Sequence, residues 1–414
     1  LIVVDEEHDS SYKQDEGIRY NARDMAISRA SMENIPILLS TSIPSLETYN
    51  NVKNKKYNLT KLEKRYKNFS LPATEVVNLN LDRKKKNIWL DSKTLNLVRK
   101  YLEKKDQVLF FLNRRGYAPF MICKKCGSKL NCPNCSIFLT FHKHINRAMC
   151  HHCGYKRSTN EKCKKSESNC EFQMYGPGVE KIFAELKQIF PEKKIKILSS
   201  DFLNKKKEAK NLLADIENNE VNILVGTQLI SKGFNFPNLN CIVVVDADFS
   251  GMGFDLRSTE KNIQLYNQLS GRAGRFSKDS LVIYQTFNPS DETLKNVIEN
   301  DPNKFLEEEI HLRKEKNLPP FTRLIAFIVA SKNERDGFLE AQKIKKNLSS
   351  LQNIEVMGPV SSPIFKIKNK YRTRLLLRSK SNLFIQKEVA KILKKINLSK
   401  KIKLTVDVDP LNFS

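Results

Sequence analysis

The chain has 414 residues, 40% of them hydrophobic, which is enough for two or three domains with apolar cores. Its 72 Lys and Arg residues against 46 Asp and Glu give a formal net charge of +26, which indicates a polyanionic partner, although solvated basic faces in a lysine-rich chain would give the same balance. No apolar run approaches the roughly 20 residues of a membrane-spanning helix, which excludes an integral membrane protein of the helical type.

The first residues form an apolar run that ends in Asp5-Glu6-Glu7-His8. This pattern is typical of a buried strand followed by an acidic turn. Nucleoside triphosphatases place an Asp here to hold Mg²⁺ beside ATP and a Glu to orient or deprotonate the attacking water. Asp5 and Glu6 are therefore candidate catalytic residues, with a plain acidic turn as the alternative. A helix at 21–30 and a buried strand at 35–39 are expected next.

A Lys- and Arg-rich segment from Lys53 to Ala73 marks a domain boundary, with one strand expected at 57–62. Beyond it the pattern predicts a short strand at 76–80, an amphipathic helix around 95–102 and a buried strand at 108–112.

Eight of the nine cysteines then follow between positions 123 and 170, and three pairs have the Cys-x2-Cys spacing that lets both thiolates reach one tetrahedral ion. Eight thiolates at four per ion predict two zinc ions. Because four thiolates close the coordination shell and leave no position for water, we expect both ions to be structural. The inner site would use Cys132, Cys135, Cys150 and Cys153, and the outer site Cys123, Cys126, Cys163 and Cys170.

A disulfide framework is the alternative for these cysteines, as is burial of each as a small apolar residue. Disulfide frameworks are typical of small secreted chains, whereas this chain is long and shows no secretory leader among its residues, so we expect a reducing, cytoplasmic location. Histidines could replace a cysteine in either site, and the candidates are His142, His144, His151 and His152.

After the cysteines an amphipathic helix is expected at 179–190, with strands at 195–198, 223–225, 241–245 and 281–284. Because these strands are continuously apolar, we expect one parallel sheet covered on both faces. Phosphate binding is expected after the strand at 223–225, through the hydroxyl of Thr227 and the charge of Lys232. An ordinary strand-to-helix turn is the alternative. Arg272 and Arg275, three residues apart on one expected helical face, suit a transferred γ-phosphate, with a solvated basic helix end as the alternative.

The tail, 301–414, is expected to be a separate α+β domain with the order βαββαβ, a ferredoxin-like split unit. Its basic residues would form a DNA surface or, alternatively, a solvated face: Lys366, Lys368, Lys370, Arg372 and Arg374.

Taken together, several of these motifs resemble the PriA family of bacterial replication-restart DNA helicases. They are Asp5-Glu6-Glu7-His8, residues 9–24, Leu112 to Pro119, the cysteines, Gly226-Thr227-Gln228 with Lys232-Gly233, and Gly271 to Arg275. The resemblance implies that Asp5 and Glu6 serve Mg²⁺ and water, that Arg272 and Arg275 face the nucleotide from a second lobe, and that Thr227 contacts DNA. Residues 10–20 are similar to the family's aromatic-rich loop that links DNA binding to hydrolysis, with Tyr12 and Tyr20 retained.

The chain departs from the family's pattern at several positions. Ile18 stands where an aromatic residue is usual, Ile43 replaces a threonine, and Ser166 stands where the last zinc ligand is expected, so Cys170 would have to serve. No glycine is followed by lysine, so the G-x-x-x-x-G-K-[ST] loop that cradles a triphosphate is absent from these residues. We therefore expect the C-terminal portion of a longer product, inactive by itself as an ATP hydrolase.

The resemblance implies the end of a first RecA-like lobe at 1–65, a second RecA-like lobe at 66–122 and 172–300 interrupted by the zinc insertion at 123–171, and the C-terminal domain at 301–414. It implies ATP-dependent 3′-to-5′ unwinding at stalled or abandoned forks and loading of the replicative helicase. The implied partners are forked and single-stranded DNA, primosome proteins and single-stranded DNA-binding protein, with no membrane. The alternative is a zinc-dependent DNA-binding or scaffold protein without motor activity.

Overall fold

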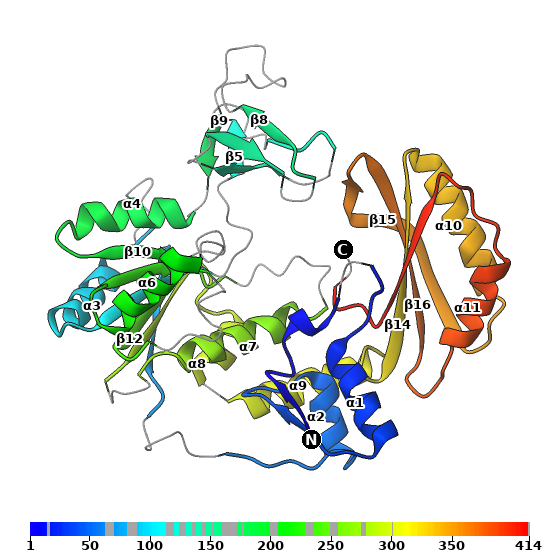
Figure 1. Cartoon of the computed structure of the whole chain (residues 1–414), viewed down its shortest axis with the longest axis horizontal. Coiled ribbons are helices and arrows are strands. Elements are labelled where there is room, and N and C mark those ends of the chain that lie inside the picture. The colour runs from blue at the N-terminus through cyan, green and yellow to red at the C-terminus, as the bar shows by residue number, and fades with distance from the viewer. Residues whose placement is uncertain are drawn as a thin grey trace.

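The computed structural model describes residues 1–14, 17–62, 70–80, 89–112, 120–123, 130–134, 138–142, 146–150, 153–158, 172–175, 178–198, 206–227, 236–248, 256–274, 279–299 and 301–412. Within these residues the chain forms four β-sheets, each in its own part of the molecule (Figure 1). None of the helices in the described ranges combines the length and apolar character that a bilayer crossing requires.

The N-terminal unit is a two-stranded parallel sheet of β1 (Ile2–Asp5) and β2 (Ile37–Ser40), joined through the 3-10 turn η1 (Ser10–Tyr12) and α1 (Ala22–Glu33). After β2 comes α2 (Leu46–Lys53), whose N-cap Ser45 accepts a hydrogen bond from the Thr48 amide. The strand expected at 57–62 is wrong: this segment is irregular, and Leu59 and Leu62 are 59% and 92% exposed. Leu59 and Leu62 are not buried against any sheet of the described residues.

The largest sheet has six strands, all parallel, as expected from their continuous apolar runs. In spatial order they are β10 (Ile195–Leu198), β11 (Ile223–Gly226), β4 (Gln107–Phe111), β12 (Leu239–Val244), β13 (Leu281–Thr286) and β3 (Ala73–Asn78).

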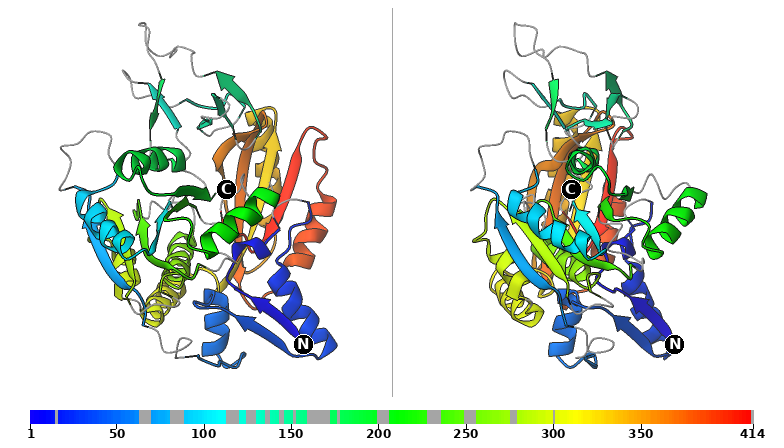
Figure 2. Two further views of the ribbon diagram at one scale, coloured as in Figure 1. Left: turned by 60° about the vertical axis from the view of Figure 1, so that its left-hand side comes forward. Right: turned by 90° about the vertical axis from the view of Figure 1, so that its left-hand side faces the viewer.

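Helices cover both faces of this sheet (Figure 2). Side chains of α3 (Ser92–Glu103) and α4 (Val179–Ile189) pack on the face that includes Val108 and Phe110. Side chains of α6 (Lys206–Glu217), α7 (Ser258–Ser270) and α8 (Glu292–Glu299) pack on the opposite face, which includes Leu109 and Phe111. The period-2 alternation of a strand thus delivers apolar residues to two cores.

A five-stranded antiparallel sheet interrupts the parallel one between β4 and α4. Its spatial order is β8 (Lys156–Ser158), β7 (Arg147–Met149), β6 (Thr140–His142), β5 (Phe120–Cys123) and β9 (Phe172–Tyr175). A small core that includes Met121, Leu139 and two cysteines supports it.

The C-terminal unit follows α9 (Pro302–Glu315) and has the expected order βαββαβ. Its antiparallel sheet runs β15 (Ile354–Ile367), β16 (Lys370–Lys380), β14 (Thr322–Ser331) and β17 (Lys403–Val408), and α10 (Glu334–Leu348) and α11 (Gln386–Lys395) cover one face. The strands expected at 354–357 and 373–377 are longer than predicted, because β15 and β16 continue to a two-residue turn at Lys368 and Asn369.

Candidate functional site

The acidic motif lies at the carboxyl end of the parallel β1–β2 pair. Asp5 is the last residue of β1, and its Oδ1 accepts hydrogen bonds from the Glu6 amide at 3.1 Å and the Ser40 hydroxyl at 3.3 Å. Glu6 has a φ of 49°, in the left-handed region that non-glycine residues occupy at an energetic cost.

Glu7, in contrast, has a structural position. Its fully buried carboxylate accepts hydrogen bonds from the Ser45 amide at 2.7 Å, the Ser45 hydroxyl at 3.0 Å and the Arg23 guanidinium at 2.9 Å. The side chain therefore ties the start of α2 to α1 and is unavailable for chemistry. Nothing in the sequence pattern distinguished Glu7 from Glu6.

His8 joins the N-terminal unit to the parallel sheet's α7. Its Nδ1 lies 2.6 Å from the Thr41 hydroxyl, which itself donates to the Ile43 carbonyl, and its Nε2 lies 3.2 Å from Nε2 of Gln268. Nδ1 also lies 3.5 Å from the Glu6 carboxylate, so the ring contacts the acidic motif, Thr41 and Gln268 together. The acidic motif and the end of α7 thus meet at one junction between units, a contact that sequence reasoning missed.

Arg272 follows this junction in a turn rather than on a helix. Helix α7 ends at Ser270, and residues 271–274 form a turn in which the Gly274 amide donates to the Leu239 carbonyl at 3.0 Å. The expectation that Arg272 shares a helical face with Arg275 is therefore wrong for Arg272, because the glycines at 271 and 274 favour a turn. Arg275 lies outside the described residues.

Thr227 lies near the carboxyl ends of the strands of the same parallel sheet. It directly follows Gly226, the last residue of β11, whereas the turn that holds Arg272 contacts Leu239, the first residue of β12. Since β11 and β12 run in parallel, Gly226 lies at the carboxyl ends of the strands and Leu239 at their amino ends. The structure separates the candidate DNA residue from the candidate nucleotide residue, and Lys232 lies outside the described residues.

The aromatic-rich loop connects the acidic motif to the C-terminal unit. Tyr12 donates from its hydroxyl to the Asp5 carbonyl at 2.6 Å, and burial, with the nearby carboxylates, raises the pKa of Tyr12. Tyr20 is 43% exposed. Between them in sequence, Lys13 lies 2.8 Å and Arg19 2.9 Å from the buried carboxylate of Asp407 on β17.

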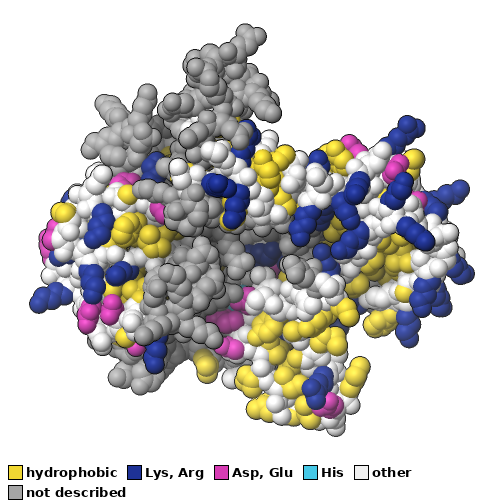
Figure 3. All heavy atoms as spheres, turned by 45° about the horizontal axis from the view of Figure 1, so that its top comes forward, with side chains coloured by type: hydrophobic (Ala, Val, Ile, Leu, Met, Phe, Trp, Pro, Cys, Tyr) yellow, Lys and Arg dark blue, Asp and Glu magenta, His cyan; other side chains and the backbone are white. Residues whose placement is uncertain are grey.

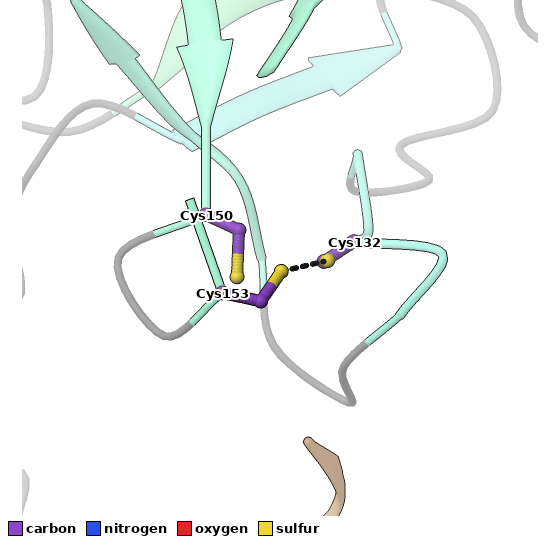
Figure 4. A group of neighbouring side chains, drawn as sticks. All are labelled: Cys132, Cys150 and Cys153. Carbon is purple, nitrogen blue, oxygen red and sulfur yellow. Dashed lines mark hydrogen bonds between the residues drawn. The ribbon is translucent and has the colours of Figure 1, made fainter. Parts of the chain in front are cut away.

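Three cysteine side chains point toward one another at the antiparallel sheet (Figure 4). The sulfurs of Cys132, Cys150 and Cys153 all lie within 4.8 Å of one another, and Cys132 and Cys153 are 3.6 Å apart. Sulfurs on a tetrahedral zinc ion with bonds of about 2.3 Å are separated by about 3.8 Å, so the cluster fits zinc. Burial raises the pKa of the Cys132 thiol to about 12, and bound metal would displace its proton.

Of the other five predicted zinc ligands, one lies among the described residues. Cys123 is buried on β5 against Phe172. Four predicted ligands lie outside the described residues: Cys126, Cys135, Cys163 and Cys170.

Comparison with known proteins gives three family models that match parts of the chain. They are the primosomal protein N C-terminal domain at residues 314–411, the helicase conserved C-terminal domain at 155–277, and the PriA DNA helicase Cys-rich region domain at 132–157. The replication restart protein PriA of Rickettsia conorii is 38% identical over 413 residues, covering 100% of this chain and 64% of the relative. That of Haemophilus influenzae is 35% identical over 426 residues, covering 100% and 57%.

The chain belongs to the PriA family of replication restart proteins. It spans just under two-thirds of the length of the Rickettsia PriA relative. Among solved structures, Saccharomyces cerevisiae Dbp5 bound to RNA and ADP BeF3 matches 76% of this chain and 62% of that one at 14% identity, with a TM-score of 0.38, a level from which nothing about function follows.

Two departures from the PriA pattern are placed by the structure. Ile43 is 1% exposed and packs with Leu46, Ile263 and Phe305 between the N-terminal unit, α7 and α9. The hydroxyl that reaches His8 is that of Thr41. Ile18, in the aromatic-rich loop, is 84% exposed.

A buried charge network holds the same junction of this PriA-family chain together. The Arg257 guanidinium forms a two-pronged contact with Glu47 on α2, and Glu260 on α7 accepts from the Leu46 amide at 3.1 Å and lies 3.5 Å from Arg313. Burial acts to raise the pKa of Glu47, but Arg257 lowers it to about 2. Glu47 therefore stays ionised across the physiological range.

Proposed function

We propose that the chain is part of an ATP-dependent 3′-to-5′ DNA helicase that recognises stalled or abandoned forks and enables loading of the replicative helicase. Family membership supports this, and within the structure the His8–Gln268 contact carries it. That contact places the strained acidic motif against the end of α7, so groups from two units can act on one phosphate.

The roles of the junction residues follow from their chemistry. Bound Mg²⁺ would neutralise charge on the ATP phosphates, and the Asp5 carboxylate would hold it. Glu6 would orient or deprotonate the attacking water. Arg272 and Arg275 would stabilise charge on the transferred phosphoryl group, since guanidinium donors match phosphate oxygens.

For DNA we propose Thr227, which directly follows β11 in the parallel sheet, together with Lys232, five positions later in the sequence, and Tyr12 and Tyr20 in the aromatic-rich loop. The face of the C-terminal sheet opposite α10 and α11 adds basic residues to this proposal. Lys and Arg side chains gather over this part of the molecule (Figure 3).

Two arginines of β16 lie on this face. Arg372 and Arg374 pair in register with Ala330 and Ile328 of β14, and the pKa of Arg372 is lowered by burial and by the charges of Arg19 and Arg374. A phosphate anion beside Arg19, Arg372 and Arg374 would offset the repulsion among these like charges.

We propose zinc in the cysteine-rich sheet, one ion held by Cys132, Cys135, Cys150 and Cys153 and a second by Cys123, Cys126, Cys163 and Cys170. The fit of the three inner sulfurs supports the first ion. We also assign the C-terminal unit to the ferredoxin-like class, because its element order is βαββαβ and its two central strands are β14 and β16. Primosome proteins and single-stranded DNA-binding protein are the proposed partners, in the cytoplasm.

The test compares residues 1–414 with the complete reading frame that contains them. Without a phosphate-binding loop, residues 1–414 should show no DNA-stimulated ATP hydrolysis, whereas the complete frame should hydrolyse ATP and unwind forks. Changing Arg272 to Ala in the complete frame should abolish turnover and leave zinc content and fork affinity within about twofold.

Two outcomes would contradict this proposal. Turnover by residues 1–414 alone would show that these residues suffice to position the phosphate. Absence of turnover by the complete frame, with fork binding retained, would favour the scaffold function instead.

A further inference from the structure

The tip of the β15–β16 hairpin, residues 366–370, contacts the cysteine-rich sheet across a large separation in sequence. The Asn369 amide donates to the Asn134 carbonyl at 2.9 Å, and the Lys366 ammonium lies 3.4 Å from the Pro133 carbonyl. Ile367 packs against the small apolar core that contains Cys132 and Cys150. The hairpin thus contacts this unit through a backbone hydrogen bond, a charged donor and an apolar side chain.

The two residues contacted are those that follow the first ligand of the cysteine cluster. Asn134 faces both sides: its backbone amide donates to the Cys132 sulfur, its side-chain amide lies 4.0 Å from the Cys153 sulfur, and its carbonyl accepts from the hairpin. A change in the position of these sulfurs is therefore transmitted through one residue to the hairpin tip.

The hairpin is built to hold this position. Lys368 and Asn369 have φ values of 49° and 61°, the geometry of a two-residue turn that matches strand twist. Lys366 and Tyr371 pair directly across the strands, and the Lys366 ammonium lies 5.1 Å from the Tyr371 ring centre. The local pairing makes the tip a stiff extension of β15 and β16.

We propose that the hairpin tip is a clamp on the zinc site, with Ile367 and Asn369 as positioning residues. Zinc held by the cluster orders Pro133 and Asn134 and so docks the tip, and the docked tip in turn slows zinc release. This inference rests on the proposed zinc site. Because the clamp carries Lys366, Lys368 and Lys370, zinc occupancy also sets where these charges stand in relation to the cysteine-rich sheet.

The first test follows amide exchange in residues 1–414 before and after zinc is stripped with a strong chelator. Exchange at the hairpin tip should become at least tenfold faster without zinc, while α10, in the same unit but on its covered face, should not change. Unchanged hairpin exchange alongside faster exchange at residues 130–158 would overturn the clamp. If the isolated protein holds no zinc at all, the proposed metal site fails, and the clamp with it.

The second test measures zinc release to a chromogenic chelator. Ile367→Ala should speed release about tenfold, as loss of a residue that supports metal ligands commonly does. Val360→Ala is the matched control, because Val360 lies on the same strand but is 50% exposed. Equal release from wild type, Ile367→Ala and Val360→Ala would show that the contact is passive and would overturn the proposal.

Discussion

At the scale of single residues, Asp407 connects the two ends of the chain. Its side chain is 8% exposed and Lys13's is 4% exposed, so the ion pair between them is buried, and Lys13 also donates to the Val408 carbonyl at 2.7 Å. A buried charge that loses its partner is strongly destabilised. This pair therefore anchors the aromatic-rich loop to β17.

Changing Asp407 to Asn should release the loop. The expected local loss is about 3 kcal/mol, the low end for a broken buried pair because the amide still accepts a hydrogen bond. Trypsin cleavage after Lys13 should then be faster by roughly 100-fold, measured by mass spectrometry of short digests. Arg29→Gln is the control, since it removes an exposed ion pair on α1 and leaves the contacts of Asp407 intact, and an equal effect from the control would argue against this anchor.

At the scale of elements, the cysteine-rich sheet has short strands and a small apolar core. The strands β6, β7 and β8 have only three residues each, and the apolar core of the sheet includes Cys132 and Cys150 themselves. Such a unit gains much of its stability from bound metal.

Metal analysis after exhaustive dialysis should therefore give close to two zinc ions per chain. A value near one would mean that the outer site, which depends on Cys163 and Cys170, does not hold metal. Cys132→Ser should remove one ion and unfold the cysteine-rich sheet, because it opens the inner site. The helical circular dichroism signal, which comes from helices outside the cysteine-rich sheet among the described residues, should stay unchanged. Loss of this helical signal would contradict the cysteine-rich sheet being a separate unit.

At the scale of the whole molecule, the formal charge of +26 predicts how the protein responds to salt. If phosphate contacts supply the affinity, the logarithm of the fork-binding constant should fall linearly with the logarithm of salt concentration. Arg372→Ala should reduce the slope by about 1. Lys391→Ala, at an exposed position on α11 on the other side of the C-terminal sheet, should leave the slope unchanged. A flat response in the wild type would assign the charge to composition alone.

The sequence alone determined the features that rest on local pattern. Continuous apolar runs predicted the parallel sheet because each strand is buried on both faces. The Cys-x2-Cys spacing predicted the cluster of Cys132, Cys150 and Cys153 because a gap of two residues lets both thiolates of a pair reach the same ion. Short motifs also indicated the family. Local pattern failed at 57–62, where Leu59 and Leu62 are exposed, and at the β15–β16 hairpin, whose strands extend beyond the predicted apolar segments.

Only the tertiary structure decided which groups meet. It separated Glu7, an anchor for α2, from Glu6, which carries the backbone strain. It also joined His8 to Gln268 and Lys13 to Asp407, pairs that are far apart in the sequence. The physical reason is that a hydrogen bond or buried ion pair depends on the positions of two atoms in space, and packing between units sets these positions, whereas a periodic pattern records only which face of its own element a residue occupies.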